Sequence, residues 1–134
     1  MKILLSIFLV ILFCFPNHGA AAPMEISTSS DHLKTQYDKY YYYDFGNVRV
    51  NWSEYADIYL KNTGSHPLHL RGVFIQGSAF WAWSNCPTWL SPGQRCLARV
   101  EFRPWTNGYF SGRLRFAFPD GNIYVDLYGW GDRW

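Results

Sequence analysis

Apolar and polar residues alternate along most of the chain after residue 53, and this alternation predicts strands. In residues 54–61, for example, Ala56, Ile58 and Leu60 alternate with polar or tyrosine residues. A period of two turns one side of a segment towards a core and the other towards solvent, as in a β-strand with one buried face. The strands predicted in this way cover residues 54–61, 66–75, 95–103, 109–118 and 123–128.

Turn residues separate these segments. Asn62–Ser65 and Pro92–Gly93 are turn sequences, and Pro119–Asn122 is typical of a hairpin turn. The aromatic run Tyr40–Phe45 predicts a first strand or an extended edge segment, whereas residues 77–93 are expected to form an irregular loop. About seven short strands with frequent turns favour an all-β fold, an antiparallel β-sandwich.

The amino terminus has the organisation of a secretory signal peptide. A positive start, Met1-Lys2, precedes an apolar run to Phe15 and small residues at positions 19–22. The run is shorter than the roughly 20 residues of a membrane span, so a signal peptide over residues 1–22 is favoured over a membrane anchor. The polar residues 23–39 are expected to be a flexible leader, and the folded domain to occupy residues 40–134.

Composition bears on both the secondary structure and the class of partner. Aromatic residues make up 20% of the chain and charged residues only 16%, which favours strands over helices. The formal net charge is +2, and it falls to +1 when Lys2 leaves with the signal peptide. A charge this small argues against a nucleic-acid partner.

The cysteines suggest a disulfide. Cys14 would leave with the signal peptide, so Cys86 and Cys96 would remain as a pair in an oxidising compartment. We expect a bond between them; the alternative is two buried free thiols. Two cysteines without a neighbouring histidine fall short of the four ligands of a structural zinc site. We therefore expect no metal and no other cofactor.

No arrangement of residues typical of catalysis is found in the sequence. A Gly-x-Ser-x-Gly nucleophile motif is absent. His66 and His69 are expected at the surface, and the outward-facing acids Asp57 and Glu101 are expected to be solvated. These observations argue against an enzyme.

Three tryptophans provide the first candidate site. Trp81, Trp83 and Trp89 lie close together in the segment that the disulfide would hold, and Trp81 and Trp83 share a face if that segment is extended. Exposed indoles are suited to stacking on a sugar or to anchoring a protein interface. The alternative is that these rings pack and anchor the loop. Our hypothesis is that at least one ring is exposed and contacts a partner.

The outward face of the last predicted hairpin is the second candidate. Across antiparallel strands its arginines can form cation–π contacts with tyrosines and ion pairs with Asp126. We therefore expect a solvated face whose residues satisfy one another, with a binding face as the alternative. The candidate binding residues of this face are Arg113, Arg115, Tyr124 and Tyr128.

The order of short motifs resembles a known family. The motifs that carry the resemblance are Asp44–Val48, Leu60–Leu68, Gly77–Phe80, Cys86–Pro87, Leu90–Cys96, Val100–Pro104, Gly108–Gly112 and Leu127–Gly131. Taken together they are similar to the abnormal-spindle/hydin (ASH) immunoglobulin-like domain, in its bacterial choice-of-anchor D form. The resemblance implies an immunoglobulin-like sandwich related to the major sperm protein fold, and a non-enzymatic module.

These expectations combine into one functional hypothesis. The protein is expected to be exported to the periplasm or the extracellular space and to serve as a non-catalytic structural or protein-interaction module. Its partner is expected to be another envelope or extracellular protein, without stable membrane insertion after signal cleavage. The alternative is a carbohydrate- or cell-surface-binding protein that uses the loop of Trp81, Trp83 and Trp89 to bind a glycan.

Overall fold

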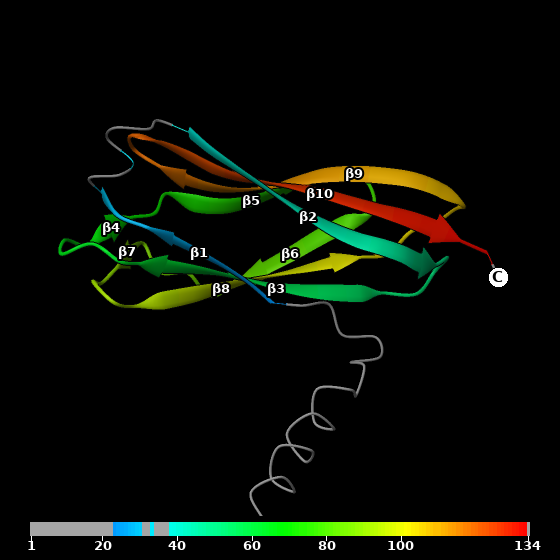
Figure 1. Ribbon diagram of the computed structural model, residues 1–134, viewed down its shortest axis with the longest axis horizontal. Coiled ribbons are helices and arrows are strands. Elements are labelled where there is room, and N and C mark those ends of the chain that lie inside the picture. Colours follow the sequence, from blue (N-terminus) through cyan, green and yellow to red (C-terminus); the bar gives the residue numbers. More distant parts are fainter. Residues whose placement is uncertain (1–22, 31–32, 34–37, 134) are drawn as a thin grey trace, which may run out of the picture.

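The computed structural model describes residues 23–30, 33 and 38–133. These residues form ten strands in two main layers (Figure 1). The predicted signal peptide, residues 1–22, lies outside the described residues and stays a prediction. The strands are β1 (Met24–Thr28), β2 (Asp38–Arg49), β3 (Glu54–Asn62), β4 (Leu68–His69), β5 (Gly72–Gln76), β6 (Phe80–Ser84), β7 (Trp89–Leu90), β8 (Arg95–Phe102), β9 (Gly108–Phe118) and β10 (Gly121–Asp132).

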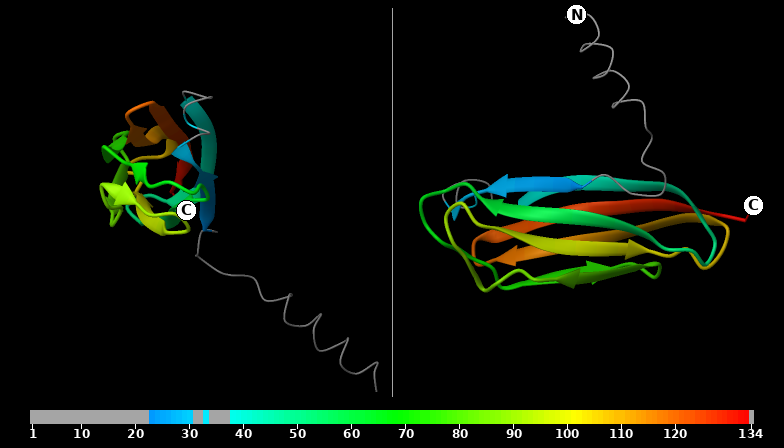
Figure 2. Two further views of the ribbon diagram at one scale, coloured as in Figure 1. Left: turned by 90° about the vertical axis from the view of Figure 1, so that its left-hand side faces the viewer. Right: turned by 90° about the horizontal axis from the view of Figure 1, so that it is seen from below.

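Two four-stranded sheets make the sandwich. One has the strand order β1-β3-β8-β6 and the other has the order β2-β10-β9-β5, while β4 and β7 form a small two-stranded sheet. In the right-hand view of Figure 2, the first sheet extends from the blue β1 to the green β6. The predicted all-β sandwich is confirmed, with more strands than the sequence suggested.

Two strand pairings are parallel, where an antiparallel arrangement was expected. β1 pairs parallel with β3, and β2 pairs parallel with β10. Parallel neighbours need a long crossover connection. The chain provides this crossover by placing β1 in one sheet and β2 in the other, so that each is added at the edge of its sheet.

The expectation of a flexible leader over residues 23–39 is wrong for β1. Met24–Thr28 pairs residue by residue with the second half of β3, and the side chains of Ile26 and Thr28 are buried. A five-residue strand with a buried threonine shows too little alternation to be recognised in a sequence. The described fold therefore includes β1, ahead of the predicted domain boundary at residue 40.

The predicted alternation produces the core between the two sheets. The Phe102 ring lies at its centre, 4.9 Å from the Phe80 ring and 5.4 Å from the Phe45 ring. A Cβ atom at Gly129 of β10 would collide with the Phe102 ring, so only glycine fits there. The predicted inward residues that are buried are Ala56, Ile58, Leu60, Leu68, Leu70, Cys96, Ala98, Val100, Phe102, Phe110, Leu114, Phe116, Phe118, Ile123, Val125 and Leu127.

The segment 77–93 is not an irregular loop throughout, and this too corrects the sequence analysis. Phe80–Ser84 forms β6, an edge strand that pairs antiparallel with β8, and Trp89–Leu90 forms β7. The alternation of β6 is hidden in the sequence because its outward residues, Trp81 and Trp83, are as apolar as its inward ones. A period of two is visible only when one side of the strand is polar.

A buried asparagine shapes the end of the sandwich near β4 and β7. The Asn62 side-chain amide donates hydrogen bonds to the carbonyl oxygens of His66, at 2.8 Å, and Leu90, at 2.9 Å. Its Oδ1 accepts a hydrogen bond from the Gly64 N–H at 3.0 Å. A buried amide with its groups satisfied costs little and specifies geometry. Asn62 therefore ties the turn after β3 to β7.

Candidate interaction surfaces

Strand β6 presents two indoles on the outer face of its sheet. Phe80 and Ala82 face the other layer, so Trp81 and Trp83 face solvent, with 50% and 59% of their surface exposed. Within the described part of the chain, neither indole has another ring or a cation stacked on it. The expectation that these two residues share a face is confirmed, and both are exposed.

Polar residues of β8 and β3 continue this surface. In the ladder, Trp81 lies opposite Glu101, and Trp83 lies opposite Arg99. Further across the sheet, Tyr55 follows Glu101 and is itself exposed. We call this surface the tryptophan face; its members are Tyr55, Asp57, Tyr59, Trp81, Trp83, Arg99 and Glu101.

An ion pair occupies the middle of the tryptophan face. The Arg99 Nε donates to Asp57 Oδ1 at 2.7 Å, and Nη2 donates to Oδ2 at 3.0 Å. The hydrogen bonds from Arg99 hold the pKa of the Asp57 carboxyl below its usual value, and Asp57 in turn raises the pKa of Arg99. The guanidinium of Arg99 is thus engaged by a carboxylate in a bidentate way and is not stacked on the indole of Trp83, which lies opposite it in the ladder.

The expected disulfide is present beside the tryptophan face. Cys86 follows β6 and is bonded to Cys96 of β8, with Cα atoms 4.9 Å apart. The Cys86 N–H also donates to the Ser84 hydroxyl at 3.0 Å. The bond therefore joins the carboxyl end of the edge strand β6 to the strand with which it pairs.

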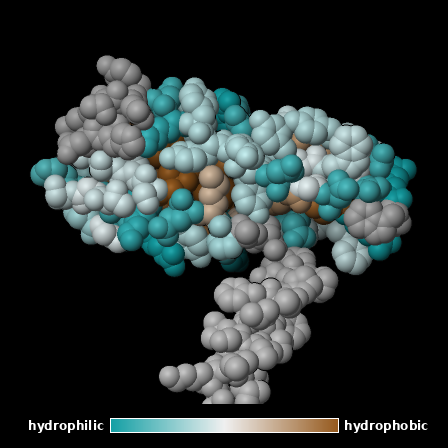
Figure 3. Space-filling model, viewed as in Figure 1, coloured by the Kyte–Doolittle hydropathy of each residue, from teal (hydrophilic) through white to brown (hydrophobic). Residues whose placement is uncertain are grey.

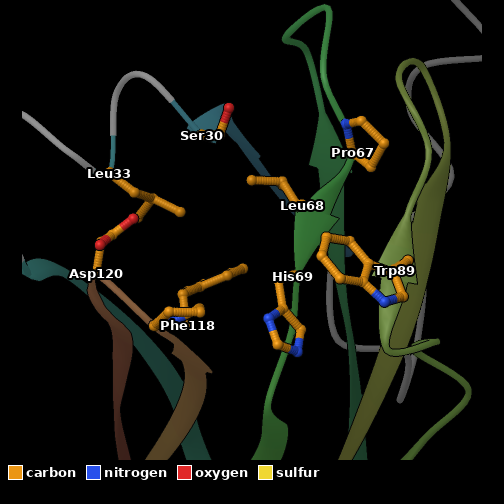
Figure 4. Close-up of a pocket in the computed structure, with 9 residues that line it drawn as sticks. Ser30, Leu33, Pro67, Leu68, His69, Trp89, Phe118 and Asp120 are labelled. Carbon is orange, nitrogen blue, oxygen red and sulfur yellow. The ribbon is translucent and has the colours of Figure 1, made fainter.

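Trp89 lies apart from Trp81 and Trp83, at the end of the sandwich formed by β4 and β7. Its ring, which is 58% exposed, is stacked on the His69 ring with centroids 4.5 Å apart. The two rings line a small pocket of about 110 Å³ together with Leu68 and Phe118 (Figure 4). Small-molecule sites are usually several times larger. The structure therefore divides the three predicted tryptophans between two separate surfaces.

The second candidate surface lies on the opposite sheet and is made of rings interleaved with arginines. The Arg113 Nε donates to Asp126 at 2.6 Å, and its guanidinium lies 4.6 Å from the Tyr124 ring centroid. Tyr124 in turn is stacked on Tyr40 of β2, with centroids 5.0 Å apart. The expected ion pair and cation–π contact within this hairpin are both confirmed.

The same mutual packing extends along β9. Arg115 lies over the Phe74 ring at 4.4 Å and donates to the Asn122 side chain at 3.2 Å. Tyr128 is stacked on Tyr109 at 6.2 Å. We call this surface the tyrosine face; its members are Tyr40, Tyr42, Phe74, Tyr109, Arg113, Arg115, Tyr124, Asp126, Tyr128 and Trp130.

Sequence reasoning missed the contribution of β2 and β5 to the tyrosine face. Tyr40, Tyr42 and Phe74 are exposed and lie beside the predicted hairpin residues. The run Tyr40–Phe45 indicated a strand, but only the parallel pairing with β10 places it here. Figure 3 views the molecule from the side of the edge strands β1 and β2, and this side is mostly hydrophilic or neutral in colour, with small hydrophobic areas between the two sheets.

Two further features of the described residues concern metal-binding groups and membrane-spanning helices. Among the residues that the structure describes, no group of three or more His, Cys, Asp and Glu side chains is placed to hold a metal ion. In the same part of the chain, no helix has the length and apolar character required to cross a membrane.

Two facing sheets, with the first two strands divided between them, define an immunoglobulin-like β-sandwich. The chain belongs to the HYDIN/CFA65/VesB-like, Ig-like domain family, which matches residues 25–129. The ASH resemblance is confirmed at this level, and the family makes the domain itself a non-catalytic Ig-like module. The finer choice-of-anchor D type stays a prediction. No curated protein sequence matches the chain.

Solved structures with this fold come from distant proteins. The secreted serine protease VesC from Vibrio cholerae is 18% identical with a TM-score of 0.51, over 66% of this chain and 21% of VesC. The Vibrio cholerae VesB protease is 15% identical with a TM-score of 0.52, over 75% of this chain and 33% of VesB. The ASH/PapD-like domain 7 of human CEP192 is 13% identical with a TM-score of 0.53, over 72% of this chain and 84% of that domain. Similarity at these identities supports the fold alone, and the chain spans a third or less of either protease.

Proposed function

We propose that the protein is an exported, non-catalytic module that binds another envelope or extracellular protein through the tryptophan face. Within its family, we assign it to the bacterial choice-of-anchor D type, on the motifs described above. One observation carries the binding role: Trp81 and Trp83 are half exposed or more, on an uncharged edge strand, and no described residue covers them.

Export has three supports. The residues before β1 have the pattern of a signal peptide. Cys86 and Cys96 are bonded, as is usual in oxidising compartments. The fold also occurs in a secreted protease. Expression in a bacterium followed by amino-terminal sequencing of the exported protein should place the new terminus between Ala21 and Pro23. Intact Met1 in a membrane fraction would contradict this proposal.

Protein binding is favoured by the physical character of the exposed rings. Tryptophan is enriched among residues that carry most of the energy of protein interfaces. The disulfide holds the end of β6 against β8, so the two indoles are displayed on a rigid element. Rigid display lowers the entropy lost on binding, which favours affinity.

A second candidate function is glycan binding by the same face. Residues two apart on a strand are about 7 Å apart, so Trp81 and Trp83 offer neighbouring ring faces on which sugar rings can stack. The adjacent Arg99 and Asp57 provide polar groups for sugar hydroxyls. This arrangement favours a glycan over other small molecules.

A photo-cross-linking experiment tests the interaction role. A benzophenone amino acid is placed at position 83 and, as a control, at position 105, because Trp105 is exposed to the same extent but belongs neither to β6 nor to the tryptophan face. Irradiation of intact cells should give protein adducts at position 83 and none at position 105. Equal labelling at the two positions, or no adduct at position 83, would overturn the proposal.

The glycan candidate has its own measurement. The exported protein is tested against a glycan array and insoluble polysaccharides, alongside the Trp81→Ala and Trp83→Ala variants. Saturable binding that both substitutions abolish, together with no protein adduct at position 83, would favour the glycan function. Absence of saturable binding would remove it.

A further inference from the structure

Strand β6 is an edge strand without the usual protection against pairing with another strand. It bonds to β8 on one side only, and its residues Phe80–Ser84 include no charge and no proline. Proteins commonly protect edges with charges, proline or bulges. The edge strands β1 and β2 carry charged residues, and Phe74 of the edge strand β5 already lies under Arg115. Among these four edge strands, β6 is therefore the one that combines an uncharged sequence with exposed rings that no arginine covers.

The phase of the ladder shows which backbone groups of β6 face the open side. The Arg103 N–H donates to the Ala79 carbonyl, and the Asn85 N–H donates to the Leu97 carbonyl. Backbone groups alternate in direction along an antiparallel strand, so odd-numbered residues of β6 bond to β8. Ala82 and Ser84 therefore direct their N–H and carbonyl groups away from β8.

Phe80 completes this edge. Its N–H already donates to the Gly77 carbonyl at 3.2 Å, which leaves its own carbonyl facing outward. The outward-facing groups of β6 are thus a carbonyl at Phe80, a donor and an acceptor at Ala82, and a donor and an acceptor at Ser84. This set is complementary to itself when it is reversed about Ala82.

The side chains have the same symmetry. The sequence on the two sides of Ala82 is the same, Trp81 before it and Trp83 after it. We propose that β6 pairs antiparallel with β6 of a second copy of this chain, about a two-fold axis at Ala82. The inference rests on the proposed interaction role of the tryptophan face, because it identifies the protein that β6 contacts as a second copy of this chain.

Such pairing provides hydrogen-bond partners for the outward backbone groups of β6 and brings the indoles of the two copies into contact. The two Ala82 residues exchange a reciprocal pair of hydrogen bonds, and each Ser84 N–H donates to the Phe80 carbonyl of the other copy. Trp81 then lies opposite Trp83 of the second copy in a position without hydrogen bonds, where Cα atoms are about 4.5 Å apart and side chains are closest. Four indoles form a row across the joined sheets. The same patch serves both copies, as in two-fold dimers generally.

Sedimentation velocity of the exported protein over a range of concentrations tests the pairing. We expect a reversible monomer–dimer equilibrium of micromolar order, because the paired edge is short and buries little area. The Ala82→Pro variant should be monomeric with an unchanged unfolding midpoint, since the N–H that proline removes does not serve the β8 ladder. A monomer at every concentration in the unaltered protein would overturn the proposal.

Introduction of like charges at the contact provides a second variant that does not alter the backbone. The Trp81→Lys/Trp83→Lys variant places ammonium groups opposite one another across the two-fold axis and should raise the dissociation constant about tenfold or more. Trp105→Lys is the matched control, because Trp105 is as exposed as Trp83 but is not part of β6, and it should leave dimerisation unchanged. Equal effects of the two changes would contradict the proposal.

Cysteine cross-linking tests the register. A Trp81→Cys chain mixed with a Trp83→Cys chain should form a mixed disulfide dimer under mild oxidation, because these positions face each other across the axis. Either variant alone should cross-link much less, since its two cysteines lie on a diagonal with Cα atoms about 7–8 Å apart. Equal cross-linking in all three samples would overturn the register. A monomeric protein that still gives adducts with a different protein at position 83 would remove the dimer and leave the proposed interaction role in place.

Discussion

The tyrosine face and the tryptophan face have similar components but differ in how these components are used. Both carry exposed aromatic rings beside arginines. On the tyrosine face, Arg113 lies over the Tyr124 ring and Arg115 lies over the Phe74 ring. On the tryptophan face, Arg99 is engaged by Asp57, and the indoles of β6 have no such cover in the described part of the chain.

Exposed aromatic content alone therefore does not distinguish the two faces, whereas the packing of their rings does. Rings and cations that pack on one another are already partly desolvated, so a partner gains less by covering them. Rings that no neighbour covers remain hydrated, so a partner that covers them gains the full free energy of their desolvation. We therefore expect substitutions on the tyrosine face to affect folding, and those on the tryptophan face to affect association.

The largest expected effect comes from the disulfide, which holds the tryptophan face but not the tyrosine face. The Cys86→Ser/Cys96→Ala variant should lose about 2–4 kcal/mol of unfolding free energy, because the cross-link restricts the unfolded chain. Urea unfolding measures this loss. Hydrogen exchange should show faster exchange in β6, while β9 and β10 keep their protection. Uniform acceleration in both sheets would mean that the disulfide does not act locally.

A ring of the tyrosine face gives the next largest effect. Tyr124→Ala removes the stack on Tyr40 and the surface under Arg113. It should cost about 1–2 kcal/mol of unfolding free energy. Tyr42→Ala is the matched control on the neighbouring strand, since Tyr42 is more exposed, and it should cost less than about 0.5 kcal/mol. Equal costs for the two variants would contradict the mutual packing of this face.

The indoles of β6 should contribute less to folding. Trp81→Ala and Trp83→Ala should each change the unfolding free energy by less than about 1 kcal/mol, because both rings are largely in solvent. Their effect should appear in association, measured by sedimentation on the same samples. A large loss of stability without a change in association would make both rings structural.

The smallest effect is a dependence on pH from the ion pair of the tryptophan face. Hydrogen bonding to Arg99 lowers the pKa of Asp57 in the folded protein. The stability from this pair is therefore fully present above the unfolded pKa of an aspartate and is lost as the pH falls through the lower, folded value. The fall in urea midpoint between neutral pH and pH about 3 should be slightly smaller in Asp57→Asn than in the unaltered protein. An identical fall in both proteins would mean that the pair does not contribute.

Much of the tyrosine face could be predicted because a short turn determines register. The turn after Phe118 places Arg113 opposite Asp126 and Arg115 opposite Tyr124. Alternation and a tight hairpin are both local, so their consequence for side-chain pairing can be derived from the sequence. The packing of Tyr40 on Tyr124 was not predictable in this way, since it depends on β2 and β10, which are far apart along the chain.

The tryptophan face was less accessible to sequence reasoning. The outward residues of β6 are tryptophans, so the strand has no polar side to reveal its period. Trp89 follows shortly after Trp83 but is held at the end of the sandwich by the pairing of β7 with β4 and by the stack on His69. The amide of Asn62 contributes to this end through bonds that no local pattern predicts.

The parallel pairing of β2 with β10 has a consequence for the order in which the fold is completed. Asp38 and Asn122, which lie 84 residues apart, meet at the start of this pairing. A chain made from its amino terminus presents the tyrosines of β2 early, while the strand that will receive them is still to be synthesised. Loss of β10 by premature termination would leave β2 without the strand with which it pairs and β9 paired with β5 alone. The tyrosine run of β2 is therefore synthesised among the first elements of the domain, but it can pair only after β10 has been synthesised.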